Sequence, residues 1–377
     1  MELSERQQRY KAIEDYRKRP LIVYATSTRP GIRALMGGDA VREFIDQVDS
    51  IRSGDSVDVL IHSSGGDALA AWKLMAVLRE RFKTIGVLVP SMAFSAATIF
   101  ALGANEIFMH PHASLGPIDP QIEVRYPNGA VRHFAYEDLG SFVQFLREEF
   151  KLSEQAHLTT VADKLFSNVD PILVGAAKRA SNLSAEVGER LLSLHMPDER
   201  RAHQIAHNLA KSFFAHGDAV TRTRAKKLDL QVADPDPNLE KLMWEAYLGL
   251  ESYMELRTPF SALGIFLADP KGAGTLTPLA PLNLPPNTPP QIAQAVWQQV
   301  MGSCAVGPGV QVQCSYVNAL IESTRAASEA RMTGTISAAL LPTGEVRVNV
   351  VDPGTSWKVM FRAPITEGET AVQDAAS

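Results

Sequence analysis

One stretch of the sequence, residues 87–121, constrains the fold more than any other part of the chain. It reads VLVPSMAFSAATIFALGANEIFMHPHASLGPIDPQ. The apolar run to Val89 predicts a strand, Pro90 and Ser91 predict a turn, and the small residues that follow predict a helix with Ser95 near its start. A helix N-terminus offers unpaired N–H groups and partial positive charge to an anion. A serine there is well placed to be a nucleophile, because the oxyanion formed on attack would meet donors already aimed at it.

The first 232 residues alternate between strand and helix patterns. Apolar β-branched runs predict strands, and apolar residues at helical spacing predict helices. The predicted strands are 21–27, 57–63, 84–89, 106–111 and a short one at 230–232. The predicted helices are 4–18, 39–51 with Asp39 as its cap, 68–82, one from 95, 136–150, 155–166, 170–195, 198–215 and 221–228, and a hairpin is predicted over 125–133. This alternation predicts an α/β fold, in which a parallel sheet core is covered by flanking helices.

The domain organisation is predicted from a break at Asp234-Pro235-Asp236-Pro237. We predict a main domain over 1–255, a Pro/Gly-rich linker over 256–290 and a small C-terminal α+β region over 291–377. Within the last two parts, helices are predicted after Pro290 and over 317–332, and strands over 335–342 and 346–352.

Composition and charge exclude some classes of protein. The chain has 377 residues, 45% of them hydrophobic, and a net charge of −5, with a pI of about 6.0. This balance argues against a nucleic-acid surface.

The two cysteines, Cys304 and Cys314, fit a reducing compartment, and the charged N-terminus lacks the apolar core of a signal peptide. Residues 84–104 are nearly uncharged, but Pro90 and small polar residues favour a buried strand-turn-helix over a membrane span. We therefore expect a cytoplasmic protein, peripheral to the membrane at most.

A second loop reinforces the interpretation of Ser95. Ser63-Ser64-Gly65-Gly66-Asp67 follows the strand 57–63 directly, and the glycines let a peptide-like ligand lie close to the main chain. In a parallel sheet both loops emerge at the same edge, where ligands usually bind. Each feature alone is more often structural, the glycines as a turn and Ser95 as an N-cap. We expect Asp67 to hold the loop by accepting backbone N–H bonds.

Three motifs together, SSGGD (63–67), PSMAFSAAT (90–98) and ASLGPIDPQ (113–121), resemble the ClpP/crotonase fold in its ClpP and signal-peptide-peptidase (SppA) branches. Among these proteins, the chain is most similar to the serine dehydrogenase proteinase (SDH) family. The resemblance runs from about Arg9 to Val232 and includes the TRTRAKKLDL segment (221–230). It implies a serine peptidase in which Ser95 attacks the scissile carbonyl, and the N–H groups of Gly66 and Ala96 receive the oxyanion. It also implies a homo-oligomer, and neither a cofactor nor a metal.

The general base is less well defined. ClpP uses a histidine after the serine helix, but the matching place here falls near Ile118-Asp119, with His110 and His112 slightly earlier. SppA-like and NfeD-like relatives use a lysine, and the helix ILVGAAKRAS (172–181) resembles the one that carries it, which implies Lys178. A lysine acts as a base only if burial or neighbours lower its pKa from about 10.4 toward neutrality. Lys164, Lys151 and His112 are the alternative bases. The pattern around Lys178 also fits a solvent-exposed lysine on a helix with no catalytic role.

Two other functions fit the same fold: a crotonase-like acyl-CoA enzyme and a non-catalytic oligomeric scaffold. The expected partners of the peptidase are peptide or unfolded protein substrates and further copies of the chain, with no nucleic acid. His203 and His207 have the i, i+4 spacing of a metal pair, but no third ligand is evident and a polar helix face is favoured.

Overall fold

The computed structural model describes residues 1–120, 122–125, 131–152, 154–167, 169–211, 219–276, 284–306, 310–340, 345–352 and 354–363. The helices are α1 (Leu3–Arg17), α2 (Ala40–Asp49), α3 (Ala68–Arg81), α4 (Ala96–Leu102), α5 (Tyr136–Glu148), α6 (Gln155–Phe166), α7 (Pro171–Ser193), α8 (Glu199–Lys211), α9 (Arg222–Lys227), α10 (Pro237–Tyr253), α11 (Ala262–Ala268), α12 (Pro270–Thr275) and α13 (Pro290–Val306). The strands are β1 (Leu21–Thr26), β2 (Ser56–His62), β3 (Thr84–Val89), β4 (Met92–Ala93), β5 (Glu106–Met109), β6 (Ser114–Leu115), β7 (Ile122–Arg125), β8 (Val131–Phe134), β9 (Val220–Thr221), β10 (Val232–Ala233), β11 (Val312–Glu322), β12 (Ala326–Leu340), β13 (Val346–Val351) and β14 (Thr355–Arg362).

The central sheet has the strand order β10-β5-β3-β2-β1-β11-β12-β13, with β14 paired to β12. The five strands from β10 to β1 are parallel, whereas β11 pairs with β1 in the antiparallel sense. The α/β class predicted from the sequence is therefore confirmed, as a mixed sheet with one parallel half. The C-terminal strands complete this sheet, while the division into three domains stays a prediction.

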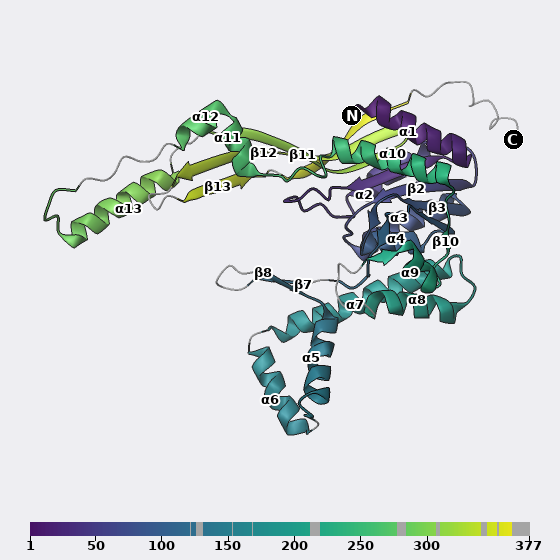
Figure 1. The fold of residues 1–377 in the computed structure, drawn as a ribbon, viewed down its shortest axis with the longest axis horizontal. Coiled ribbons are helices and arrows are strands. Elements are labelled where there is room, and N and C mark those ends of the chain that lie inside the picture. Colours follow the sequence, from purple (N-terminus) through teal and green to yellow (C-terminus); the bar gives the residue numbers. More distant parts are fainter. Residues whose placement is uncertain are drawn as a thin grey trace, which may run out of the picture.

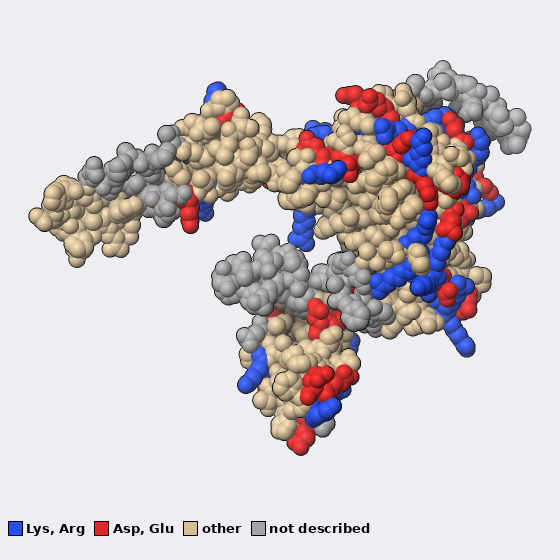
Figure 2. Space-filling view, in the orientation of Figure 1, with Lys and Arg blue, Asp and Glu red and all other residues tan. Residues whose placement is uncertain are grey.

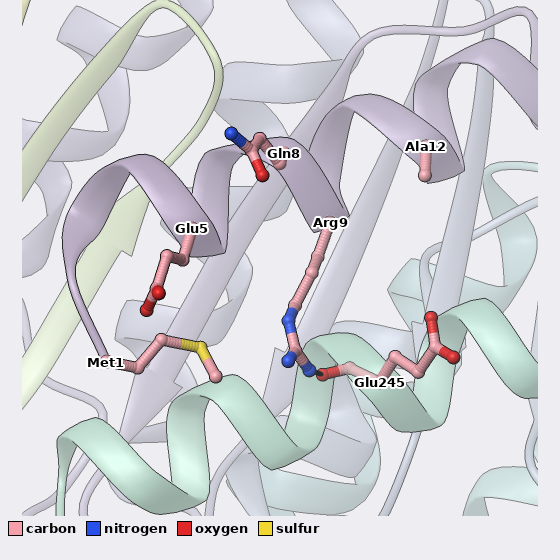
Figure 3. Close-up of a pocket in the computed structure, with 6 residues that line it drawn as sticks. All are labelled: Met1, Glu5, Gln8, Arg9, Ala12 and Glu245. Carbon is pink, nitrogen blue, oxygen red and sulfur yellow. Dashed lines mark hydrogen bonds between the residues drawn. The ribbon is translucent and has the colours of Figure 1, made fainter.

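The parallel strands are buried on both faces, which explains their largely apolar sequences. In β1, Ile22 and Tyr24 face the layer formed by α2, α3 and α4, and Leu21 and Val23 face α1 and α10. Figure 1 shows these two helix layers on either side of the sheet. Close up, α1 lies alongside α10, and Arg9 of α1 donates to the carbonyl oxygen of Glu245 on α10 (Figure 3).

Two projections leave this body (Figure 1). One consists of α5 and α6 with the start of α7, and the other of the far ends of β11 and β12 with β13, α11, α12 and α13. The helix predicted over 317–332 is wrong, because these residues form the β11–β12 hairpin. Its small residues fit a helix as well as a strand, and pairing of β11 with β1 decides the outcome. The linker predicted over 256–290 contains the short helices α11 and α12.

Charged side chains are unevenly distributed over the molecule. Figure 2 shows both signs interspersed over the body, and few charged groups on the projection that ends in α13. The sequence agrees, since residues 272–321 contain no Asp, Glu, Lys or Arg. Among the described residues, no helix combines the length and apolar character needed to cross a bilayer. Residues 84–104 instead form β3, β4 and α4 within the core, as expected.

The histidine at the end of β2 makes the fold sensitive to acid. His62 is buried, its Nε2 lies 3.0 Å from the Thr28 hydroxyl, and its ring packs on Tyr247. Burial lowers the pKa of His62 to about 4, whereas an unfolded histidine titrates at about 6.5. Between these values the unfolded chain binds the extra proton, so stability is complete above about pH 6.5 and falls as the pH drops toward 4.

We predict that His62 lowers the free energy of unfolding by about 2 kcal/mol when the pH falls from 7.5 to 5. The measurement is urea denaturation at both pH values for wild type and His62→Gln, which stays neutral throughout. The difference between the two proteins isolates His62 from the other titrating groups. An equal loss of stability in both proteins would contradict the prediction.

Candidate active site

Ser95 lies at a sharp turn between β4 and α4. Its backbone adopts φ 50° and ψ −117°, and its side chain makes no capping hydrogen bond to the helix. Positive φ is unfavourable for a residue with a side chain and persists only where the surrounding structure holds it. Here Ala97 N donates to Phe94 O at 2.9 Å and Ile99 N donates to Ser95 O at 3.0 Å. The Ser95 side chain is therefore half-buried, and its hydroxyl is not used to cap α4.

The glycine loop packs directly against this turn. Gly65 and Gly66 have φ of 108° and 153°. A Cβ on Gly65 would lie 2.6 Å from the Cβ of Ser95, and one on Gly66 would lie 2.2 Å from Met36 O. Close approach and backbone conformation thus both require glycine at these two positions. Asp67 ends the loop by capping α3, since its Oδ1 accepts from Leu69 N at 2.9 Å, as the sequence predicted.

Two backbone N–H groups beside Ser95 have no acceptor within the part of the chain that the structure describes. Met36 pairs with the loop through Met36 N to Gly65 O (2.7 Å) and Asp67 N to Met36 O (2.9 Å), which leaves the Gly66 N–H between them unused. The other is the N–H of Ala96, the first residue of α4. Both residues line the same cavity as Ser95. Unpaired donors at such a position suit an anion or a developing oxyanion.

A buried threonine holds the turn from behind. The hydroxyl of Thr98 lies 2.6 Å from Ala93 O and accepts from Gly116 N at 3.0 Å. It therefore ties β4, just before Ser95, to the loop that follows β6. Thr98 is fully buried, so these bonds are shielded from water.

The cavity has a volume of about 320 Å³ and one of its walls comes from α7. Ala180, Leu183 and Ser184 of that helix line it. Sequence reasoning missed this wall. The signal was a row of small residues at spacings of four, three and four, Ala177, Ser181, Ser184 and Gly188, all of which are buried. At Gly188 the helix packs closely on Ile118 and Leu102.

None of the four bases weighed from the sequence is among the residues that line this cavity. Lys178 is exposed, and its Nζ lies 5.9 Å from the centre of the Tyr136 ring on α5. Successive helix residues turn by about 100°, so Lys178 lies roughly opposite Ala180 on α7. Lys151 and Lys164 are exposed on the α5–α6 projection.

The histidines after β5 lie on the other side of the sheet. His110 stacks on Trp244 of α10, with ring centres 5.0 Å apart, and His112 contacts the same ring edge-on. Burial, and then the neighbouring His112, lower the pKa of His110. The sequence comparison placed the histidine of ClpP near Ile118 and Asp119. Both of these residues are buried, and Ile118 N donates to Leu209 O at 3.0 Å. Which group is the general base stays a prediction.

The histidine pair on α8 has a local partner. His203 Nδ1 lies 2.7 Å from Glu189 Oε2, and the rings of His203 and His207 are 5.9 Å apart. Among the described residues, no group of three or more His, Cys, Asp or Glu side chains is placed to hold a metal ion.

Comparison with known proteins identifies the segment that contains this site. Residues 36–140 match the family described as ClpP-like SDH-type serine proteinases. Two uncharacterized proteins of Methanocaldococcus jannaschii are each 29% identical to the chain, over 191 and 199 residues. These matches cover 51% and 53% of this chain and 56% and 59% of the archaeal proteins, so the chain spans little more than half of their length.

Some solved protease structures are similar to the chain at a lower level. A mutant of the membrane-bound stomatin-specific protease 1510-N matches with a TM-score of 0.36 and 15% identity, over 59% of this chain and 84% of that one. ClpP1 from Listeria monocytogenes matches with a TM-score of 0.30 and 12% identity, over 61% and 97% of the two chains. The family match spans Gly66, Ser95 and Ala96 but ends before Lys178. Residues 36–140, which include Gly66, Ser95 and Ala96, are thus similar to the ClpP-like SDH-type serine proteinases.

Proposed function

We propose that this protein is a serine peptidase that hydrolyses peptide bonds through an acyl-enzyme on Ser95. The observation that carries the proposal is the placement of the Ser95 hydroxyl beside two unused N–H donors in one cavity. A peptide carbonyl seated there is attacked by Ser95 Oγ, and its oxygen becomes an anion. The N–H groups of Gly66 and Ala96 donate to that anion, and one such donor is worth roughly 100- to 1,000-fold in kcat.

The proton of Ser95 must pass to a base and then to the leaving amine, so that water can afterwards hydrolyse the ester. We propose Lys178 for this role because it lies on α7, the helix that forms one wall of the cavity. In a single copy of the chain its amine contacts Tyr136 instead. The proposal therefore requires α7 to present Lys178 to Ser95, either within one chain or from a neighbouring copy in a homo-oligomer.

A fluorophosphonate probe tests the nucleophile. We expect wild type to be labelled at one serine, and Ser95→Ala to remain folded without labelling. Equal labelling of both proteins would exclude Ser95 as the nucleophile. An unlabelled wild type that also hydrolyses no peptide would favour the non-catalytic scaffold.

Methionine substitutions test the base, because they keep the length of a lysine side chain without its charge. We expect Lys178→Met to lose at least about 100-fold in kcat, within the usual range for a general base, and Lys151→Met and Lys164→Met to retain activity. Mixing Ser95→Ala with Lys178→Met then distinguishes the two geometries. Recovered activity would place the base in a neighbouring copy, and no recovery would place both groups in one chain. Normal turnover by Lys178→Met would transfer the role to another residue.

A further inference from the structure

Ser63 connects the two halves of the site through its backbone. It follows β2 directly and only 1% of it is exposed. Its N–H donates to Met92 O at 3.2 Å, and its carbonyl accepts from Phe94 N at 3.0 Å. These two bonds hold Met92 and Phe94, the neighbours of Ala93, just before Ser95. The start of the glycine loop and the approach to the nucleophile are thereby held in one register.

The side chain of Ser63 reaches the glycine loop itself. Its Oγ accepts from Gly65 N at 3.0 Å and pairs with the hydroxyl of Thr26 at 2.7 Å. Thr26 is fully buried on β1, so the hydroxyl pair is anchored in the sheet. Gly65 is buried too, so loss of the Ser63 hydroxyl would leave a buried N–H without this acceptor.

A pair of glycines needs such a restraint, since neither has a Cβ that limits rotation of the peptide between them. The peptide unit between Ser64 and Gly65 is held because Gly65 N donates to Ser63 Oγ. The next unit, between Gly65 and Gly66, is held because Gly65 O accepts from Met36 N. Because the C=O and N–H of a trans peptide point in opposite directions, the Gly66 N–H is directed away from Met36, and Gly66 lines the cavity. We expect that loss of the bond from Gly65 N to Ser63 would leave only the Met36 bonds to hold the loop and would let the Gly66 N–H shift.

We propose that Ser63 is a positioning residue for catalysis, which keeps the Gly66 donor in place through its bond to Gly65. This inference rests on the proposed peptidase function. Because oxyanion donors act in the transition state, loss of the Ser63 hydroxyl should lower kcat and leave KM nearly unchanged.

The test compares three variants in fluorophosphonate labelling and peptide hydrolysis. We expect Ser63→Ala to lower the labelling rate and kcat by about 10- to 1,000-fold, the upper figure being the loss of one whole donor. Ser63→Thr keeps the hydroxyl and should stay within a few-fold of wild type. Ser56→Ala is the matched control, a serine-to-alanine change at the far end of the same strand, and should leave both rates unchanged. Thermal unfolding confirms that each variant is folded.

A folded Ser63→Ala with wild-type kcat would overturn the inference, as would a raised KM with kcat unchanged. Hydrogen exchange in wild type gives a second test that needs no variant. The Gly65 amide should exchange much more slowly than the unbonded Gly66 amide, and equal rates would overturn the inference even if Ser63→Ala fails to fold. A wild type that is not labelled would remove the peptidase function, while the exchange result would still show whether the restraint exists.

Discussion

Gly66→Ala is expected to lower kcat by at least about 100-fold, because it displaces one of the two proposed oxyanion donors. The Cβ added at Gly66 would lie 2.2 Å from Met36 O and 2.6 Å from Met36 N, where no side-chain atom fits. Met36 makes the two hydrogen bonds that orient the loop, so the loop and Met36 must separate. A φ of 153° adds strain of roughly 1–3 kcal/mol for a residue other than glycine.

The control for this prediction is Gly54→Ala. Gly54 also has a left-handed φ, 93°, but a Cβ there would meet no atom within 4 Å. It should therefore show the cost of backbone strain alone, as a lower midpoint of urea denaturation with unchanged peptide hydrolysis. Steady-state kinetics on both variants separate the two effects. Wild-type kcat in a folded Gly66→Ala would show that the Gly66 N–H takes no part in the reaction.

The half of the fold that holds the site could be predicted from the sequence because its signals are local. The strands before the two loops are continuous apolar runs, and Gly65, Gly66 and Ser95 lie in loops that directly follow such runs or the turn after them. Parallel strands bring those loops to one edge without any further information. The structure accordingly places Gly66, Ser95 and Ala96 around a single cavity.

The general base could not be predicted in this way, since it depends on which face of α7 meets the body. Lys178 is preceded by apolar and small residues, which suggested burial. The face that packs is instead the row of small residues from Ala177 to Gly188, and it turns Lys178 toward Tyr136. Helical periodicity favours this face, but the sequence does not show which body surface it contacts.

Asp39 illustrates the same limit for a polar residue. It precedes α2 and was predicted to cap it, but its side chain makes no capping bond there. Its carboxylate instead accepts from the indole N–H of Trp357, at 2.8 Å. The competing donor lies in β14, a strand that follows the incorrectly predicted helix over 317–332. Because β14 was not predicted from the sequence, its competition for Asp39 could not be predicted either.

The second large effect is expected at Glu322, on β11, a strand that the sequence did not predict. Its carboxylate accepts from Arg6 Nε at 3.0 Å, from Arg6 Nη2 at 2.5 Å and from the Tyr10 hydroxyl at 2.7 Å. All three side chains are buried, and the bonds join α1 to the antiparallel edge of the central sheet. Burial and then the Glu322 carboxylate raise the pKa of Tyr10, which therefore stays a donor.

We predict that Glu322→Gln lowers the unfolding free energy by roughly 3–5 kcal/mol, because it leaves the buried Arg6 guanidinium without its hydrogen-bonded counter-charge. The double variant Arg6→Met/Glu322→Gln removes that charge as well and should recover a large part of the loss. Lys11→Met is the control, since it breaks the exposed pair with Asp15 on the same helix and should barely move the urea midpoint. If Glu322→Gln unfolds at the wild-type urea concentration, or if the double variant is no more stable than Glu322→Gln, the buried pair does not secure α1 to the C-terminal strands.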